Sequence, residues 1–233
     1  MNWKIISAIF EKDLKDSIRN MVVLSVIGIP VMLSIVTMAG FPPDVGQLLL
    51  PTWITVTVVM VAINVAPTLF SEEKEMRILD AILVSPASDI DVIAGKELLG
   101  IFMAVSASLL VLVLSNGFIG EIPALICIIT LGSIGLTGLG LFIGIMSKSM
   151  ISTSSIAVFA TITLMFPAII PHPPDIIQLM FKAIPSYYVI NAISKVMFVG
   201  IGSTKLWIDL SALIIFDLVV LLGCVYALKM GRD

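Results

Sequence analysis

Residues 73–86 read EKEMRILDAILVSP, and this charged segment separates two long apolar runs. Leu79, Ile82 and Leu83 fall at helical spacing within it, while Asp80 lies on another side of the same helix. The segment therefore predicts a short amphipathic helix. Because both flanking runs are apolar, we expect this helix to be the main water-facing surface with which the chain meets a soluble partner.

The residues that follow predict where this helix ends and the next one begins. Pro86 ends it, because the residue before a proline avoids the α conformation. Ser88 and Asp91 are then spaced as a capping box, in which each side chain bonds to the backbone of the other residue. A second helix should start there and run through Gly95 and Lys96 into the next apolar run.

The same segment resembles a motif of the membrane permeases of type 2 ATP-binding cassette (ABC) exporters. That family carries a run reading EKERGTLE, then aliphatic residues and Ser-Pro, and later a Gly-Lys pair that enters a membrane helix. Residues 76–78 differ from the family's Arg-Gly-Thr, and Asp80 replaces its glutamate. The residues that match in order are Glu73, Lys74, Glu75, Leu79, Leu83, Val84, Ser85, Pro86, Gly95 and Lys96.

The resemblance implies that residues 71–97 form a cytoplasmic loop containing a coupling helix. In the family this helix sits on a separate ATPase subunit and transmits its closure to the membrane helices. ATP and Mg²⁺ would bind to that partner, and a second permease subunit, identical or homologous, would complete the transporter. The residues expected to couple to the ATPase are Glu73, Glu75, Arg77, Leu79, Asp80, Ile82, Leu83, Ser85 and Pro86.

Composition places the whole chain in a membrane. Its 233 residues are 59% hydrophobic and 12% charged, with a mean hydropathy of +1.15, whereas soluble domains are about 45–50% apolar and about 25% charged. The runs close to the roughly 20 residues that cross a bilayer lie at about 21–39, 52–70, 98–115, 122–146, 151–170 and 207–228. We therefore expect one all-α, polytopic permease domain of residues 1–233, with six spans in the lipid bilayer.

The basic residues indicate which side of the membrane each loop faces. With six spans, only Lys182, Lys195 and Lys205 fall on one side. The other side holds Lys4, Lys12, Lys15, Arg19, Lys74, Arg77, Lys96, Lys148, Lys229 and Arg232. Because cytoplasmic loops carry an excess of Lys and Arg, the richer side is cytoplasmic. Both termini and the coupling loop are thus expected on the cytoplasmic side of the cell membrane.

Two further segments are partly apolar but are not predicted to cross. Residues 1–20 carry an apolar stripe made of Trp3, Ile6, Phe10, Leu14 and Ile18. It predicts a helix on the membrane surface. This helix serves either as an anchor alone or, as the family resemblance implies, also as a contact with the ATPase. Residues 171–206 are interrupted by Pro185, and a full span there would carry the basic C-terminus outside. We expect two short helices that form a re-entrant outer segment before the last span.

A few polar and small residues inside the spans are candidates for function or packing. Asp217 lies near the middle of the last span, where a carboxylate costs roughly 2.5–3.5 kcal/mol. It is expected to line the transport path, bind a cation, or bond to another span. Asn64 in the second span is its candidate partner. Gly140 and Gly144 predict close helix packing, within the subunit rather than at a dimer seam.

No residue pattern indicates catalysis by this chain. Gly95 and Lys96 are followed by Glu97 and lack the upstream glycine of a phosphate-binding loop. With one histidine in all, no zinc cluster is expected, and neither a metal nor a nucleic acid partner is predicted. We interpret the chain as the transmembrane subunit of an ABC exporter of unidentified substrate. The alternatives are an ion channel or ion-coupled carrier that uses Asp217 without an ATPase, and a membrane scaffold subunit.

Overall fold

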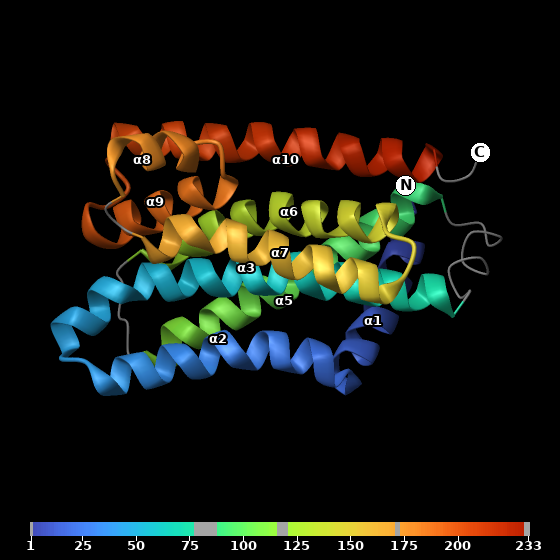
Figure 1. Ribbon diagram of the computed structural model, residues 1–233, viewed down its shortest axis with the longest axis horizontal. Helices are drawn as coiled ribbons and strands as arrows, with labels where there is room; N and C mark the ends of the chain where they lie inside the picture. The colour runs from blue at the N-terminus through green and yellow to red at the C-terminus, as the bar shows by residue number, and fades with distance from the viewer. Residues whose placement is uncertain (1, 77–87, 116–120, 171–172, 231–233) are drawn as a thin grey trace.

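Long apolar helices lie side by side along one common direction in the computed structural model (Figure 1). The structure describes residues 2–76, 88–115, 121–170 and 173–230, and this part of the chain contains helices but no strands. The helices are α1 (Trp3–Arg19), α2 (Met21–Gly40), α3 (Pro43–Glu75), α5 (Asp89–Leu114), α6 (Ile122–Met146), α7 (Met150–Ile169), α8 (Asp175–Phe181), α9 (Pro185–Phe198) and α10 (Thr204–Met230).

Six of these helices are long and apolar enough to cross a membrane, namely α2, α3, α5, α6, α7 and α10. The predicted architecture, an all-α polytopic membrane protein, is therefore confirmed. Two helices extend beyond their predicted apolar runs. Helix α3 runs over 33 residues from Pro43 to Glu75, and α5 begins at Asp89, where the capping box at Ser88 predicts its start. Charged residues such as Glu and Lys are good helix formers, so both helices continue beyond their apolar runs.

These longer helices shorten the connection between them. The expected loop of residues 71–97 contains the last turn of α3 and the first turns of α5, and only residues 76–88 lie between the two helices. The capping box predicted at Ser88 is confirmed, because its side chain accepts from the backbone N–H of Asp91, whose carboxylate accepts from the backbone N–H of Ser88.

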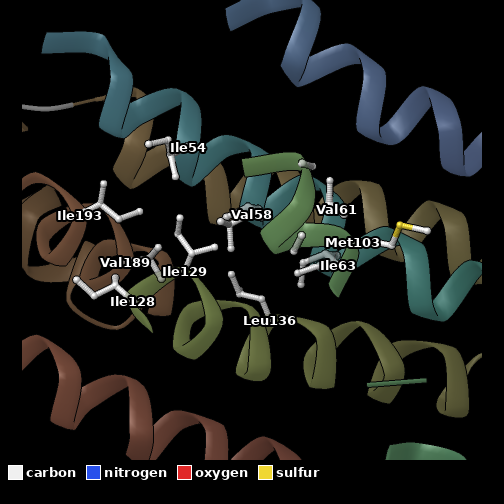
Figure 2. Packing of buried hydrophobic residues seen from close by; sticks show 14 of the residues in the cluster. Ile54, Val58, Val61, Ile63, Met103, Ile128, Ile129, Leu136, Val189 and Ile193 are labelled. Carbon is white, nitrogen blue, oxygen red and sulfur yellow. The ribbon is translucent and has the colours of Figure 1, made fainter. Parts of the chain in front are cut away.

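Helix α3 forms the centre of the bundle. Its side chains Ile54, Val58 and Ile63 are fully buried, and Figure 2 shows them converging with side chains of α5, α6 and α9. In lipid, such packing rests on close van der Waals contact. A Cβ at Gly140 of α6 would lie 2.7 Å from the carbonyl oxygen of Ile63, and one at Gly144 would lie 3.3 Å from Cα of Pro67. The predicted packing of these glycines within the subunit is confirmed.

Helix α1 is present as predicted, and it packs part of the predicted stripe, Ile6, Phe10 and Leu14, against the bundle. Its place on the membrane surface stays a prediction. Trp3 and Ile18, at the ends of the stripe, are 66% and 61% exposed. The buried residues of α1 are Ile6, Ile9, Asp13 and Ser17. Asp13 lies outside the stripe, and it is buried beside a partner on α5 that is described below.

The segment before the last span forms the two short helices that the sequence predicts. Helices α8 and α9 meet at an angle of 100°, and they lie at the end of the bundle away from α1 and both chain termini (Figure 1). Helix α9 buries Val189, Ala192 and Ile193. The Ser186 hydroxyl donates to the carbonyl oxygen of Leu164 in α7. Since α7 arrives at the end from which α10 leaves, the pair fits a re-entrant segment.

Candidate functional site

A cluster of opposite charges joins the C-terminal end of α3 to α1 and α5. The Lys96 ammonium of α5 is 1% exposed, and it lies 3.0 Å from Oδ2 of Asp13 and 2.6 Å from Oε2 of Glu73. Lys12 of α1 also pairs with Glu73, and its Nζ is 3.2 Å from Oδ1 of Asp13. The ring of Phe70 lies 5.9 Å from the Lys96 ammonium. We call these four charged residues, Lys12, Asp13, Glu73 and Lys96, the charge cluster.

The charges of the cluster balance, which explains how it can be buried. An isolated buried charge loses its hydration, and only close opposite charges and hydrogen bonds compensate that loss. Two lysines face two buried carboxylates here, and Lys12 also lies 3.6 Å from the exposed carboxylate of Asp16. Burial by itself would lower the pKa of the Lys12 ammonium, but hydrogen bonding and charge from Glu73, together with the Asp13 carboxylate, raise it above its ordinary value. Lys12 therefore stays charged, and the cluster holds three helices together.

The residues on either side of Glu73 bond to the other helices. Glu72 accepts from the Asn20 amide at 3.1 Å, where α1 turns into α2. Lys74 donates to the carbonyl oxygens of Ile145 and Ser147 at the end of α6, at 2.9 and 2.8 Å. A cation there also interacts favourably with the negative end of the helix dipole.

The last residue of α3 contacts the start of another span. Glu75 accepts from the backbone N–H of Met150, the first residue of α7, at 2.6 Å. A carboxylate is favoured at this positive end of a helix. Residues 72–75 thus bond, one after another, to the α1–α2 junction, the charge cluster, α6 and α7. The end of α3 is connected to five other helices by side chains of four consecutive residues.

The start of α5 is held in a similar way. Asp91, which closes the capping box, also accepts from the backbone N–H of Asn2 through Oδ1 at 2.7 Å. Asn2 in turn caps α1, because its side chain accepts from the backbone N–H of Lys4. Both flanks of residues 77–87 are therefore bonded to α1, on one side through Glu73 and on the other through Asp91.

The expected coupling residues fall into three groups. Glu73 is buried in the charge cluster, so its carboxylate contacts other helices of this chain. Glu75 is exposed apart from its bond to α7. The others lie outside the described residues: Arg77, Leu79, Asp80, Ile82, Leu83, Ser85 and Pro86.

The two residues expected near the transport path are not brought together. Asn64 donates to the Thr161 hydroxyl of α7 at 2.9 Å and to the carbonyl oxygen of Met60 at 2.7 Å. Asp217 lies against α6, where a Cβ at Gly135 would be 2.2 Å from its Oδ1. The structure records no hydrogen bond between these two described side chains. Asn64 serves the contact of α3 with α7, while Asp217 faces α6.

Sequence reasoning did not select Glu97, a second carboxylate buried inside a span. It is 7% exposed, although it follows directly on Lys96. The apolar run begins at about residue 98, so Glu97 falls just before it. The helix begins at Asp89, as the capping box at Ser88 predicts, and Glu97 lies two turns inside it. Counting the span from the predicted start of the helix would have identified Glu97 as a carboxylate inside it.

Comparison with known families agrees with this arrangement. The family model described as ABC-2 family transporter protein matches residues 6–226, which is nearly the whole chain. No curated protein matches the sequence. A permease of this family is the membrane subunit of an ABC transporter, is not itself the ATPase, and works with an ABC ATPase subunit. This chain belongs to the ABC-2 transporter family, as one of its membrane-embedded permeases.

Proposed function

We propose that this chain is the transmembrane subunit of an ABC exporter, and that residues 72–96 convert closure of the ATPase into movement of the membrane helices. The observation that carries the proposal is the set of bonds made by four consecutive residues at the end of α3, Glu72 to Glu75, to the α1–α2 junction, α5, α6 and α7. The coupling residues proposed to touch the ATPase are Arg77, Leu79, Asp80, Ile82, Leu83, Ser85 and Pro86.

A force applied between α3 and α5 would reach the rest of the bundle through these bonds. Helix α3 is continuous over 33 residues, so it is about 50 Å long, which exceeds the roughly 30 Å of the hydrocarbon core. The N-terminal end of α3 lies at the end of the bundle that also holds α8 and α9 (Figure 1). A displacement of Glu73 by the ATPase would therefore reach the outer segment along one uninterrupted helix, although Pro51 and Pro67 in its interior each remove a backbone hydrogen bond.

The proposal includes an orientation and an assembly. The C-terminal end of α3, both termini and α1 lie at one end of the bundle (Figure 1), and this end carries most of the Lys and Arg residues. We therefore propose that the protein lies in the cytoplasmic membrane and that this end of the bundle faces the cytosol. Six spans are half of a twelve-span transporter, so a second permease, identical or homologous, would complete it. ATP and Mg²⁺ would bind to the ATPase partner.

The transport path is proposed to involve Asp217, a buried carboxylate in the last span. Asn64, the second residue considered for the path, lies at the contact of α3 with α7, where it bonds to Thr161. We therefore propose that Asn64 keeps these two helices in register beside the path. The transported substrate is not specified by either residue.

The experiment that tests the proposal separates ATPase binding from force transmission. The tagged full chain is purified from its own cells in mild detergent, and the co-purifying ATPase is identified by mass spectrometry. Replacing Leu79 and Leu83 together by Asp should abolish co-purification, because it places two charges on the proposed apolar contact face. Replacing Lys74 by Met should preserve co-purification but reduce stimulation of ATP hydrolysis, because α3 loses its bonds to α6.

A matched control is Lys148→Met, which removes an exposed lysine at the same end of the bundle. It should change neither binding nor stimulation. Undiminished recovery of the ATPase with the Leu79→Asp, Leu83→Asp variant would sink the proposed contact. Co-purification of no ABC ATPase with the wild-type chain would favour the channel, carrier or scaffold instead.

A further inference from the structure

Two buried carboxylates from different helices face the same side of α6. Glu97 of α5 is 7% exposed and Asp217 of α10 is 6% exposed. A Cβ at Gly138 would lie 3.7 Å from Oε2 of Glu97, and one at Gly135 would lie 2.2 Å from Oδ1 of Asp217. Positions three apart on a helix are neighbours, about 5–6 Å from each other. The two carboxylates therefore meet over the glycine face of α6, between α5 and α10.

Neither carboxylate has a compensating partner in the described part of the chain. Both oxygens of Glu97 and Oδ1 of Asp217 are buried without a hydrogen bond, and the Thr137 hydroxyl of α6, which faces Gly100 of α5, is buried without one too. Buried polar atoms are nearly always hydrogen-bonded, so this group of unpaired oxygens calls for an explanation. Such oxygens can bind a proton, which supplies the missing hydrogen-bond donor.

The charged and titratable groups on the surrounding helices have other partners, and one of them, the Cys224 thiol, lies at the site itself. On α5, the Lys96 ammonium belongs to the charge cluster with Asp13 of α1 and Glu73 of α3. On α10, the Cys224 thiol donates to the carbonyl oxygen of Gly138. The remaining ionised pair nearby joins Lys195 of α9 to Asp209 of α10. Among the described residues, the structure therefore places no free cation against Glu97 or Asp217.

We propose that Glu97 and Asp217 form a proton-binding site. One carboxyl group keeps its proton at neutral pH and uses it to donate a hydrogen bond to the other carboxylate. Two like charges buried side by side in an apolar medium cannot both persist, and the pair relieves the repulsion by keeping one proton. The site joins α5 and α10 across α6, so loss of the proton would push these two helices apart. This inference goes beyond the exporter proposal, because it requires no ATPase.

The proton can be detected with dicyclohexylcarbodiimide, an apolar reagent that modifies protonated carboxyl groups. The full chain is reconstituted in phosphatidylcholine vesicles and treated from about pH 5 to about pH 9, a range that spans the ordinary and the strongly raised pKa of a buried carboxyl. Peptide mass spectrometry then locates the modified residue. We expect modification of Glu97 or Asp217 at neutral pH. The pH at which half of this modification is lost should lie above 7.

Isosteric variants test whether the two groups act as a pair. In Asp217→Asn the neighbouring charge is gone, so modification of Glu97 should be lost at a pH lower by about one to two units. Asp209→Asn is the matched control, because it removes a carboxylate of the same helix that is already paired with Lys195. This control should leave unchanged the pH at which modification of Glu97 or Asp217 is lost.

Several results would overturn the proposal. One is wild-type protein in which neither Glu97 nor Asp217 is modified at neutral pH. Another is an Asp217→Asn variant in which modification of Glu97 is lost at the same pH as in the wild type. Protection of both residues by Na⁺ or K⁺ at constant pH would show that a cation occupies the pair instead. If the variant fails to fold, infrared spectroscopy of the wild type decides, because a protonated carboxyl band that disappears on titration is required.

Discussion

Replacing Lys96 by Met removes the most deeply buried ammonium of the charge cluster while keeping a side chain of similar length. Asp13 and Glu73 would then share only Lys12, and the cluster would carry one uncompensated negative charge. Removing one partner of a buried ion pair costs about 3–5 kcal/mol. Because Lys12 still contacts both carboxylates, we expect the lower end, about 3 kcal/mol.

The loss should appear in the thermal unfolding of the purified protein. For a chain of this size, 1 kcal/mol shifts the midpoint by about 2–4 °C, so Lys96→Met should lower it by about 6–12 °C. Unfolding in lipid nanodiscs can be followed by tryptophan fluorescence. The exposed Lys148→Met is the matched control, and it should lower the midpoint by no more than about 2 °C.

A second substitution distinguishes charge imbalance from lost packing. In the double variant Lys96→Met, Asp13→Asn, the remaining pair of Lys12 and Glu73 is balanced again. Replacing a buried pair by neutral groups is often close to neutral in free energy, so the double variant should recover most of the midpoint. A double variant no more stable than Lys96→Met, or a single variant as stable as Lys148→Met, would refute the reasoning.

Three further predictions concern packing, topology and Asp217. Gly140→Ala forces a Cβ to within 2.7 Å of a carbonyl oxygen of α3 and should destabilise the protein by about 1–3 kcal/mol. The control Gly28→Ala, whose Cβ would meet nothing within 4 Å, should not destabilise it. Equal thermal unfolding midpoints for the two variants would contradict this prediction. Cysteines placed at Ser88 and Ser203 of a cysteine-free chain should react with impermeant reagents from opposite sides of the membrane. Labelling from one side would disprove the six-span topology. Asp217→Asn should still co-purify with the ATPase but lose the pH dependence of ATPase stimulation, and an unchanged pH profile would assign Asp217 a packing role.

The sequence alone determined the architecture because a bilayer sets local conditions. A span needs about 20 apolar residues whose backbone bonds are satisfied within the same helix. These conditions depend only on neighbouring residues, so all six spans could be predicted from the sequence. The capping box at Ser88 and the family motif are local patterns too, and they could be recognised for the same reason. The C-terminal end of α3 was missed, because helical structure continues through charged residues beyond the apolar run.

Only the tertiary structure decided which polar groups meet. Lys96 and Asp13 are separated by 83 residues, and no local pattern pairs them. Helices that are apolar on all sides also carry no signal of which face is inside. Glu97 and Asp217 could therefore be recognised as neighbours only once α5 and α10 were placed on α6. The burial of Asp13 on α1 could not be predicted for the same reason, because its partner Lys96 lies on another helix.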